Sequence, residues 1–230
     1  MSNTSKSNIM SFLERNPDLF KEMGNIGMGH ACTALSQILN IKVNRSIPAV
    51  WSLTREETEG YLELFEGGSI GVRLTLSEDV GGAIMHVVSF PFAARLIRLF
   101  FSDKEMSGIE DIDEMSMSVV QEMTNITTAA FVNSLSAMTG LFIDISTPHF
   151  CTNLTTELLP QPSEGQPCSG QHDDSVTASE LDKVIVVENR FLVDMGTISS
   201  ELIFMPHRES LGVIAEKLCQ RYGFELPSEL

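Results

Sequence analysis

Basic residues are scarce in this chain: 15 Lys and Arg stand against 31 Asp and Glu, which makes the formal net charge -16 at pH 7. Such a charge repels nucleic acids and anionic membrane surfaces. The N-terminal residues lack a signal-peptide core, and the most apolar stretch, residues 81–101, is interrupted by Pro91, Arg95 and Arg98. We therefore expect a cytoplasmic protein whose partners include neither nucleic acid nor a membrane.

Patterns typical of metal sites and disulfide frameworks are also missing. The four cysteines form no CxxC pair, and the five histidines form neither an HxH nor an HExxH arrangement. The glycine-rich run from Asn25 to His30 lacks the lysine of a P-loop and the full GxGxxG spacing. We expect reduced thiols, no metal or other cofactor held by this chain, and no nucleotide site.

The chain has 230 residues, of which 43% are hydrophobic, and can therefore bury a substantial core. Helical and extended patterns follow each other in the same order twice: one helix, three strands and one helix. In the first half these elements are expected at residues 19–39, 41–53, 61–76, 82–89 and 91–101. An acidic connector, residues 102–114, leads to the second set, which is expected at residues 115–138, 141–153, 183–194, 197–205 and 209–222.

Strands joined by short turns predict an antiparallel sheet. The predicted fold class is therefore α+β, an internally duplicated unit with long helices packed on the sheet. We treat residues 1–230 as one domain with pseudo-repeats at about 8–102 and 103–222. The second repeat is interrupted by residues 155–179, where proline and glycine lie among polar neighbours. This composition predicts a disordered loop.

The two repeats align at an offset of 100 residues. This alignment pairs Glu22 with Glu122, Asn25 with Asn125, Asp18 with Ser118, and Pro48 with Pro148. Apolar positions agree as well, which makes duplication a better explanation than chance.

The paired polar residues share one face of each predicted helix. At about 100° per residue, Asp18, Glu22, Asn25 and Gly29 gather opposite an apolar stripe formed by Leu19, Met23, Ile26 and Ala34. The second helix repeats this face with Ser118, Glu122, Asn125 and Ala129, opposite Val119, Met123, Ile126, Ala130 and Ala137. Gly29 and Ala129 leave bare backbone beside the asparagines, as a docking surface requires. Gly24 and Gly27 are interpreted as positions of close helix packing.

The pattern Asp/Ser-x3-Glu-x2-Asn-x22-Pro resembles that of the CheC, CheX and FliY phosphatases, which act on the phosphorylated chemotaxis regulator CheY. Both copies fit it in full, and the resemblance runs from about residue 8 to residue 222. It includes the phrase Lys-Glu-Met-Gly-Asn-Ile-Gly. Two complete sites in one chain are most similar to the CheC members, whereas residues 155–179 depart from the family pattern.

The resemblance implies a phosphatase that hydrolyses the aspartyl phosphate of a phosphorylated response regulator. Asn25 or Asn125 would enter the active site of the regulator and hold the attacking water, while Glu22 or Glu122 would pair with a lysine there. The regulator would supply Mg²⁺. An amide suits this role because it donates and accepts hydrogen bonds without being consumed.

Two alternatives stay open. The same helix faces could belong to a non-catalytic binding module for a response regulator or for the receptor deamidase CheD, or the chain could be a structural part of a flagellar switch. The two intact asparagines favour the phosphatase. Asp18 and Ser118 either extend the docking face or orient the glutamates, or are only solvated. Pro48 and Pro148 are expected to start or interrupt the strand after each helix and are assigned to structure, not chemistry.

Overall fold

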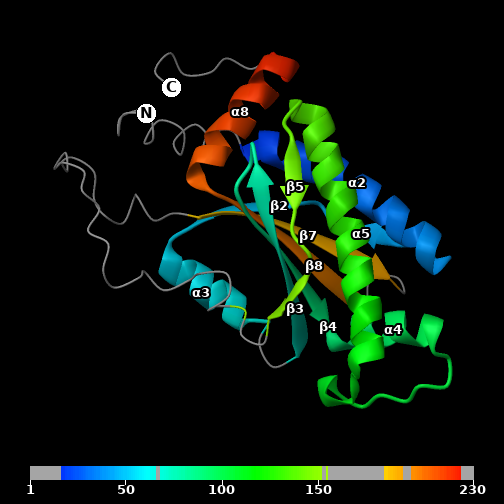
Figure 1. Ribbon diagram of the computed structural model, residues 1–230. Helices are drawn as coiled ribbons and strands as arrows, with labels where there is room; N and C mark the ends of the chain where they lie inside the picture. Colours follow the sequence, from blue (N-terminus) through cyan, green and yellow to red (C-terminus); the bar gives the residue numbers. More distant parts are fainter. Residues whose placement is uncertain (1–16, 66–67, 152–153, 155–183, 194–197, 224–230) are drawn as a thin grey trace.

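A computed structural model describes residues 17–65, 68–151, 154, 184–193 and 198–223. The predicted loop at residues 155–179 lies outside these ranges. The strands form one eight-stranded sheet in which every pairing is antiparallel. Figure 1 shows the long helices on one side of this sheet and α3 on the other. The predicted α+β class is confirmed.

The element bounds lie close to the predicted ones. In the first half they are α2 (Pro17–Leu39), β1 (Asn44–Arg45), β2 (Ala49–Leu53), α3 (Arg55–Glu63), β3 (Ser69–Glu78), β4 (Gly82–Ser89) and α4 (Phe90–Phe100). In the second half they are a 3-10 turn (Ile109–Asp111), α5 (Glu114–Thr139), β5 (Ile143–Ile145), β6 (His149–Cys151), β7 (Val184–Val193), β8 (Ile198–Pro206) and α8 (Arg208–Tyr222).

Two predictions about the strands were wrong. The first strand of each half is broken in two, and the break contains Pro48 in one half and Pro148 in the other. Proline cannot donate a ladder hydrogen bond, which explains why both breaks fall there. The strand predicted at residues 61–76 begins as helix α3, and only its second part is β3.

The start of α3 is specified by a capping box. The Thr54 hydroxyl accepts a hydrogen bond from the Glu57 backbone amide at 3.2 Å, and the Glu57 carboxylate accepts one from the Thr54 amide at 2.8 Å. A Thr-x-x-Glu sequence satisfies two free helix donors in this way. Leu62 then anchors the helix in the core on that side of the sheet.

The two halves exchange their outer strands. The strand order is β1-β7-β8-β4-β3-β5, with β2 also on β7 and β6 also on β3. The short strands after α2 therefore pair with the second half, and those after α5 pair with the first. The register is the same in both halves: Val50 lies opposite Val187, and Phe150, 100 residues after Val50, lies opposite Val72 at the equivalent position of β3.

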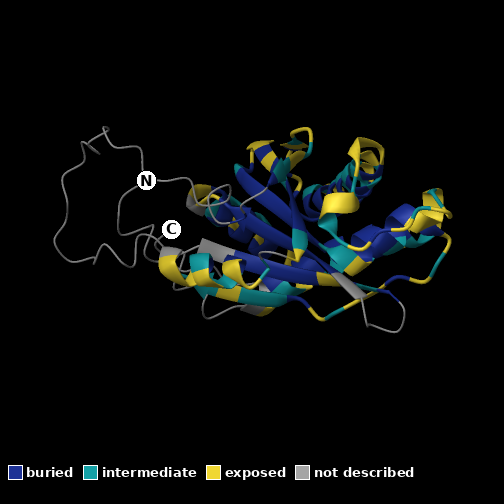
Figure 2. Cartoon of the chain, turned by 90° about the horizontal axis from the view of Figure 1, so that it is seen from below, coloured by how far each residue is buried: buried dark blue, intermediate teal, exposed yellow. Residues whose placement is uncertain are grey.

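The sheet separates two hydrophobic layers. The larger one packs α2, α4, α5 and α8 on one face, and the smaller one packs α3 on the other. Residues alternate between the layers along each strand: on β8, Phe204 faces the long helices and Ile203 faces α3. The strands are largely buried, whereas the helices carry exposed residues on their outer sides (Figure 2).

The buried stripes of the long helices differ from those predicted. On α2, Met23 is buried as expected, but Ile26 and Ala34 are only half-buried, and the core is filled by Phe20, Met28, Ala31 and Leu35. On α5, Ala137 is exposed and Ala130 only half-buried, while Val120, Phe131 and Leu135 are buried. Each helix contacts both the sheet and the other helix, and its buried face is therefore wider than a single stripe.

Two further sequence expectations concern thiols and membranes. Cys32, Cys151 and Cys219 are buried, and Cys168 lies outside the described residues. No helix in the described part of the chain combines the length and apolar character needed to cross a bilayer.

A buried histidine joins the sheet to α5. His86 on β4 is 2% exposed, and its Nε2 lies 2.9 Å from the Thr128 hydroxyl and 3.4 Å from that of Thr127. Its ring stacks on Phe191. Burial lowers the pKa of His86 from 6.5 to about 3, so this side chain stays neutral in the folded protein at neutral pH.

We expect His86 to make folding sensitive to acid. Between pH 6.5 and 3 the unfolded chain binds a proton here that the folded chain does not, so its stabilising contribution is lost as pH falls from 6.5. The stability of the wild type should fall relative to His86→Leu by up to about 1.4 kcal/mol per pH unit in this window. Urea unfolding of both proteins between pH 8 and 4.5 tests this. A difference that does not change with pH would contradict it.

Candidate functional site

The four predicted site residues lie on the outer sides of α2 and α5. We call Glu22 with Asn25 site 1, and Glu122 with Asn125 site 2. In both sites the glutamate is exposed and the asparagine is half-buried. The burial classes of residues 20–29 and 120–129 agree position by position. The repeated sequence pattern therefore places the same pair of side chains at the surface twice.

Asp18 and Ser118 do not orient the glutamates. The Asp18 carboxylate accepts a hydrogen bond from Lys21 at 3.1 Å, one turn along the same helix. The Ser118 hydroxyl donates to the Glu114 carbonyl at 2.9 Å. Both contacts are local to the helix surface, so these residues border the two sites without fixing the geometry of the glutamates.

Close packing between α2 and α5 begins beside the sites. A Cβ atom at Gly27 would lie 2.6 Å from Cδ2 of Phe131, a distance that real structures do not tolerate. At Gly24 the nearest atom would be Cβ of Pro48, 3.1 Å away. The interpretation as a position of close helix packing is confirmed for Gly27. Gly24 packs instead against Pro48, which has the structural place expected of it.

Gly29 differs from these two glycines. A Cβ there would meet only Nε of Arg45, at 4.0 Å, which is ordinary van der Waals contact. Beyond it, His30 Nδ1 lies 2.7 Å from the Ser134 hydroxyl and links the two helices. Gly29 therefore leaves its stretch of backbone open beside Asn25, as the sequence pattern indicated.

Arg45 is the residue of site 1 that sequence reasoning missed. Its Nη1 donates a hydrogen bond of 2.6 Å to Oδ1 of Asn25. Nothing among the described residues forms a hydrogen bond with the Asn125 side chain. The signal was present in the alignment of the repeats, because the position equivalent to Arg45 holds Ile145.

The space enclosed beneath α5 cannot hold a metabolite. A cavity lined by His86, Met123 and Thr127 has a volume of about 10 Å³, roughly that of one water molecule. Pockets for small substrates are typically about 300–1,000 Å³. The two Glu-Asn pairs therefore lie on open surface, a geometry that suits a macromolecular partner.

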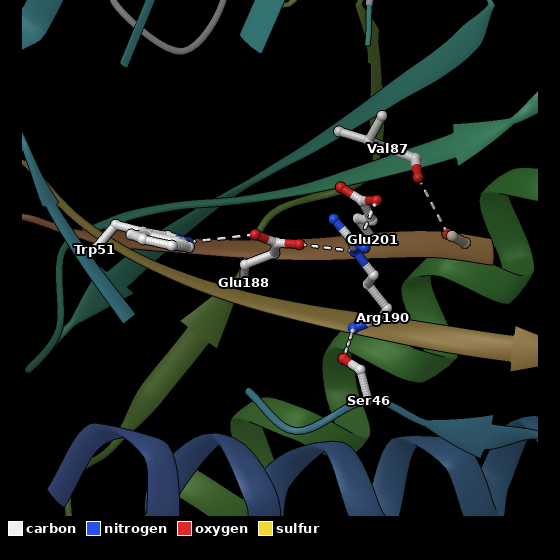
Figure 3. Close-up of polar contacts among 7 residues, drawn as sticks. Ser46, Trp51, Val87, Glu188, Arg190 and Glu201 are labelled. Carbon is white, nitrogen blue, oxygen red and sulfur yellow. Dashed lines mark hydrogen bonds and ion pairs between the residues drawn. The ribbon is translucent and has the colours of Figure 1, made fainter. Parts of the chain in front are cut away.

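A separate polar cluster lies on the α3 side of the sheet (Figure 3). Nε of Arg190 is 2.8 Å from Glu188 and 3.1 Å from Glu201, and Trp51 donates to Glu188 at 3.3 Å. Burial and the charge of Glu188 raise the pKa of Glu201 to about 7, although Arg190 opposes this. The sheet separates this cluster from both sites.

No group of three or more His, Cys, Asp or Glu side chains suited to a metal ion occurs among residues 17–65, 68–151, 154, 184–193 and 198–223.

Comparison with known proteins identifies this arrangement. The model of the CheC-like family matches residues 18–51 and 115–154, the two segments that contain the Glu-Asn pairs and the prolines after them. In these two segments the chain is similar to the CheC-like family. The CheY-P phosphatase CheC of Bacillus subtilis is 27% identical over 175 residues, which cover 74% of this chain and 82% of that protein.

Two further relatives of this chain carry the name FliY. The flagellar motor switch phosphatase FliY of Bacillus subtilis is 30% identical over 139 residues, 60% of this chain and 35% of that protein. The crystal structure of FliY from Thermotoga maritima has the same fold, with a TM-score of 0.66 at 21% identity, covering 96% of this chain and 98% of that one.

Alanine substitutions test the different surroundings of Gly27 and Gly29 on helix α2. Gly27→Ala should destabilise the protein by about 1–3 kcal/mol, because the added methyl group collides with the buried ring of Phe131. Gly29→Ala should stabilise it by up to about 1 kcal/mol, since alanine favours the helix and its Cβ would meet only Nε of Arg45, at 4.0 Å. Urea unfolding compares the two variants. Equal stabilities would show that α2 and α5 do not pack at Gly27.

Proposed function

We propose that this chain is a phosphatase that hydrolyses the aspartyl phosphate of a phosphorylated response regulator of the CheY type. The observation that carries the proposal is the doubled Glu-Asn pair, exposed on two helices in matching surroundings. The similarity to CheC of Bacillus subtilis, a CheY-P phosphatase, supports it. We place this activity in the cytoplasm and in chemotaxis signalling.

The asparagine would act on the water that attacks phosphorus. That water needs a free lone pair for phosphorus, so it is best oriented by donating a hydrogen bond to an acceptor such as the amide oxygen. The oxygen of the water bonds to phosphorus, the bond from phosphorus to the aspartyl oxygen breaks, and the aspartate leaves as a carboxylate. The proton of the water passes to the released inorganic phosphate.

The glutamate would supply docking. Glu22 and Glu122 lie one helical turn before the asparagines and are exposed, so each carboxylate can meet a lysine of the regulator while the amide enters its active site. In this mechanism Mg²⁺ belongs to the phosphorylated regulator, and this chain contributes positioning alone.

We expect the two sites to contribute separately to turnover. With a CheY-type regulator as substrate, Asn25→Ala and Asn125→Ala should each remove part of the accelerated dephosphorylation. The double variant should lower kcat on the order of a hundredfold because water positioning is lost at both sites. Phosphate release after removal of the phosphodonor measures this, and Asn133→Ala, an exposed asparagine of α5 outside the site, is the matched control.

Kinetic measurements distinguish a phosphatase from a non-catalytic binding module. Glu22→Ala and Glu122→Ala should raise KM as well as lower kcat, because docking is weakened. A regulator that binds the wild type and decays no faster would show an adaptor in place of a phosphatase. Wild-type turnover by a folded double asparagine variant would exclude the proposed chemistry.

A further inference from the structure

A charged contact restrains the amide of site 1. Nη1 of Arg45 and Oδ1 of Asn25 are 2.6 Å apart, a short hydrogen bond with an ionised donor. A guanidinium group only donates, so it is the amide oxygen that faces Arg45. The two residues come from different elements, α2 and β1, so the contact exists only in the folded chain.

The exchanged strands place Arg45 beside the helix. Arg45 pairs with Phe191 of β7, which belongs to the other half of the sheet. From there its side chain reaches α2, where Nε lies 4.0 Å from the position that a Cβ of Gly29 would occupy. The guanidinium group therefore lies along the surface between Gly29 and Asn25, over the backbone left open beside the site.

Site 2 has the same frame without the restraint. Ile145 occupies the equivalent position, in the same register opposite Leu76 of β3, and its side chain has no donor. Ala129 stands where site 1 has Gly29. Within the described ranges, Asn125 makes no side-chain hydrogen bond, and its amide is free to accept one from water.

The hydrogen bond from Arg45 occupies the amide oxygen of Asn25 that would otherwise accept a hydrogen bond from the attacking water. We propose that Arg45 is a positioning residue that holds the Asn25 amide against its own chain and makes site 1 the slower of the two sites. This inference rests on the proposed function. To act, the amide must turn outward and offer its oxygen to the attacking water, and the bond to Arg45 uses that oxygen and fixes its direction.

The restraint is reversible. Arg45 is exposed, and no acidic side chain of the described residues forms an ion pair that would hold it in place. The amide therefore alternates between the bond to Arg45 and solvent. Arg45 slows site 1 by the fraction of time that Asn25 is held, and does not abolish its activity.

Exchanging Arg45 and Ile145 between the two sites tests whether Arg45 slows site 1. Site 1 is isolated by Asn125→Ala and site 2 by Asn25→Ala. In the first background, Arg45→Ile should raise kcat roughly three- to tenfold, because a hydrogen bond to a charged group is removed. In the second, Ile145→Arg should lower kcat. Arg45→Ile should also shift the side-chain amide resonances of Asn25 in a ¹⁵N correlation spectrum, an effect that a change in fold stability alone does not produce.

The controls separate the failure of each proposal. If the wild type does not accelerate dephosphorylation, the proposed function is wrong. If Arg45→Ile leaves the side-chain amide resonances of Asn25 unchanged, the hydrogen bond between Arg45 and Asn25 is absent in solution. If the wild type is active and Arg45→Ile leaves kcat unchanged or lowers it, Arg45 does not restrain site 1. A rise in KM at unchanged kcat would make Arg45 a docking residue instead. Thermal unfolding of each variant verifies that it is folded.

Discussion

Each half of this protein completes its part of the sheet with strands from the other half. β1 and β2 pair with β7, and β5 and β6 pair with β3, so neither repeat contains all of the backbone partners it needs. Unpaired strand edges and buried unpaired amides are costly, which couples the folding of the two repeats. The exchange also places α2 and α5 on the same face of one sheet, because each helix is followed directly in the chain by the short strands that pair with the other half.

The two sites depend on how closely these helices approach each other. Gly27 meets the ring of Phe131 where any side chain would collide, and His30 bonds to Ser134 further along the same interface. This packing fixes the inner sides of both helices and leaves the Glu-Asn pairs on the outer sides. A rigid helix then presents each pair, as the proposed entry of the amide into a response regulator requires.

The sheet register and the burial of the site helices are the same in both halves of the duplicated chain, whereas the polar contacts beside the two sites differ. The sheet register is the same for the short strands of both halves, and the burial of the site helices follows the offset of 100 residues. The polar contacts beside the two sites differ: Arg45 has no counterpart at Ile145, and the pairing of Asp18 with Lys21 is replaced by a hydroxyl at Ser118. Such surface groups can change without disturbing the core, so the two sites can diverge while the fold stays the same.

The sequence by itself determined the repeated order of elements, the antiparallel α+β class and the placement of Glu and Asn on one exposed helix face. These features follow from local periodicity and from spacing within a single helix, which the chain carries at every position. It also contained the Thr54 to Glu57 capping box that begins α3, a local signal that was overlooked in favour of a strand. Only the tertiary structure decided the exchange of strands, the width of the buried helix faces and the bond from Arg45 to Asn25. Each of these depends on residues that are distant in the chain, and their contacts form only when the sheet brings both halves together.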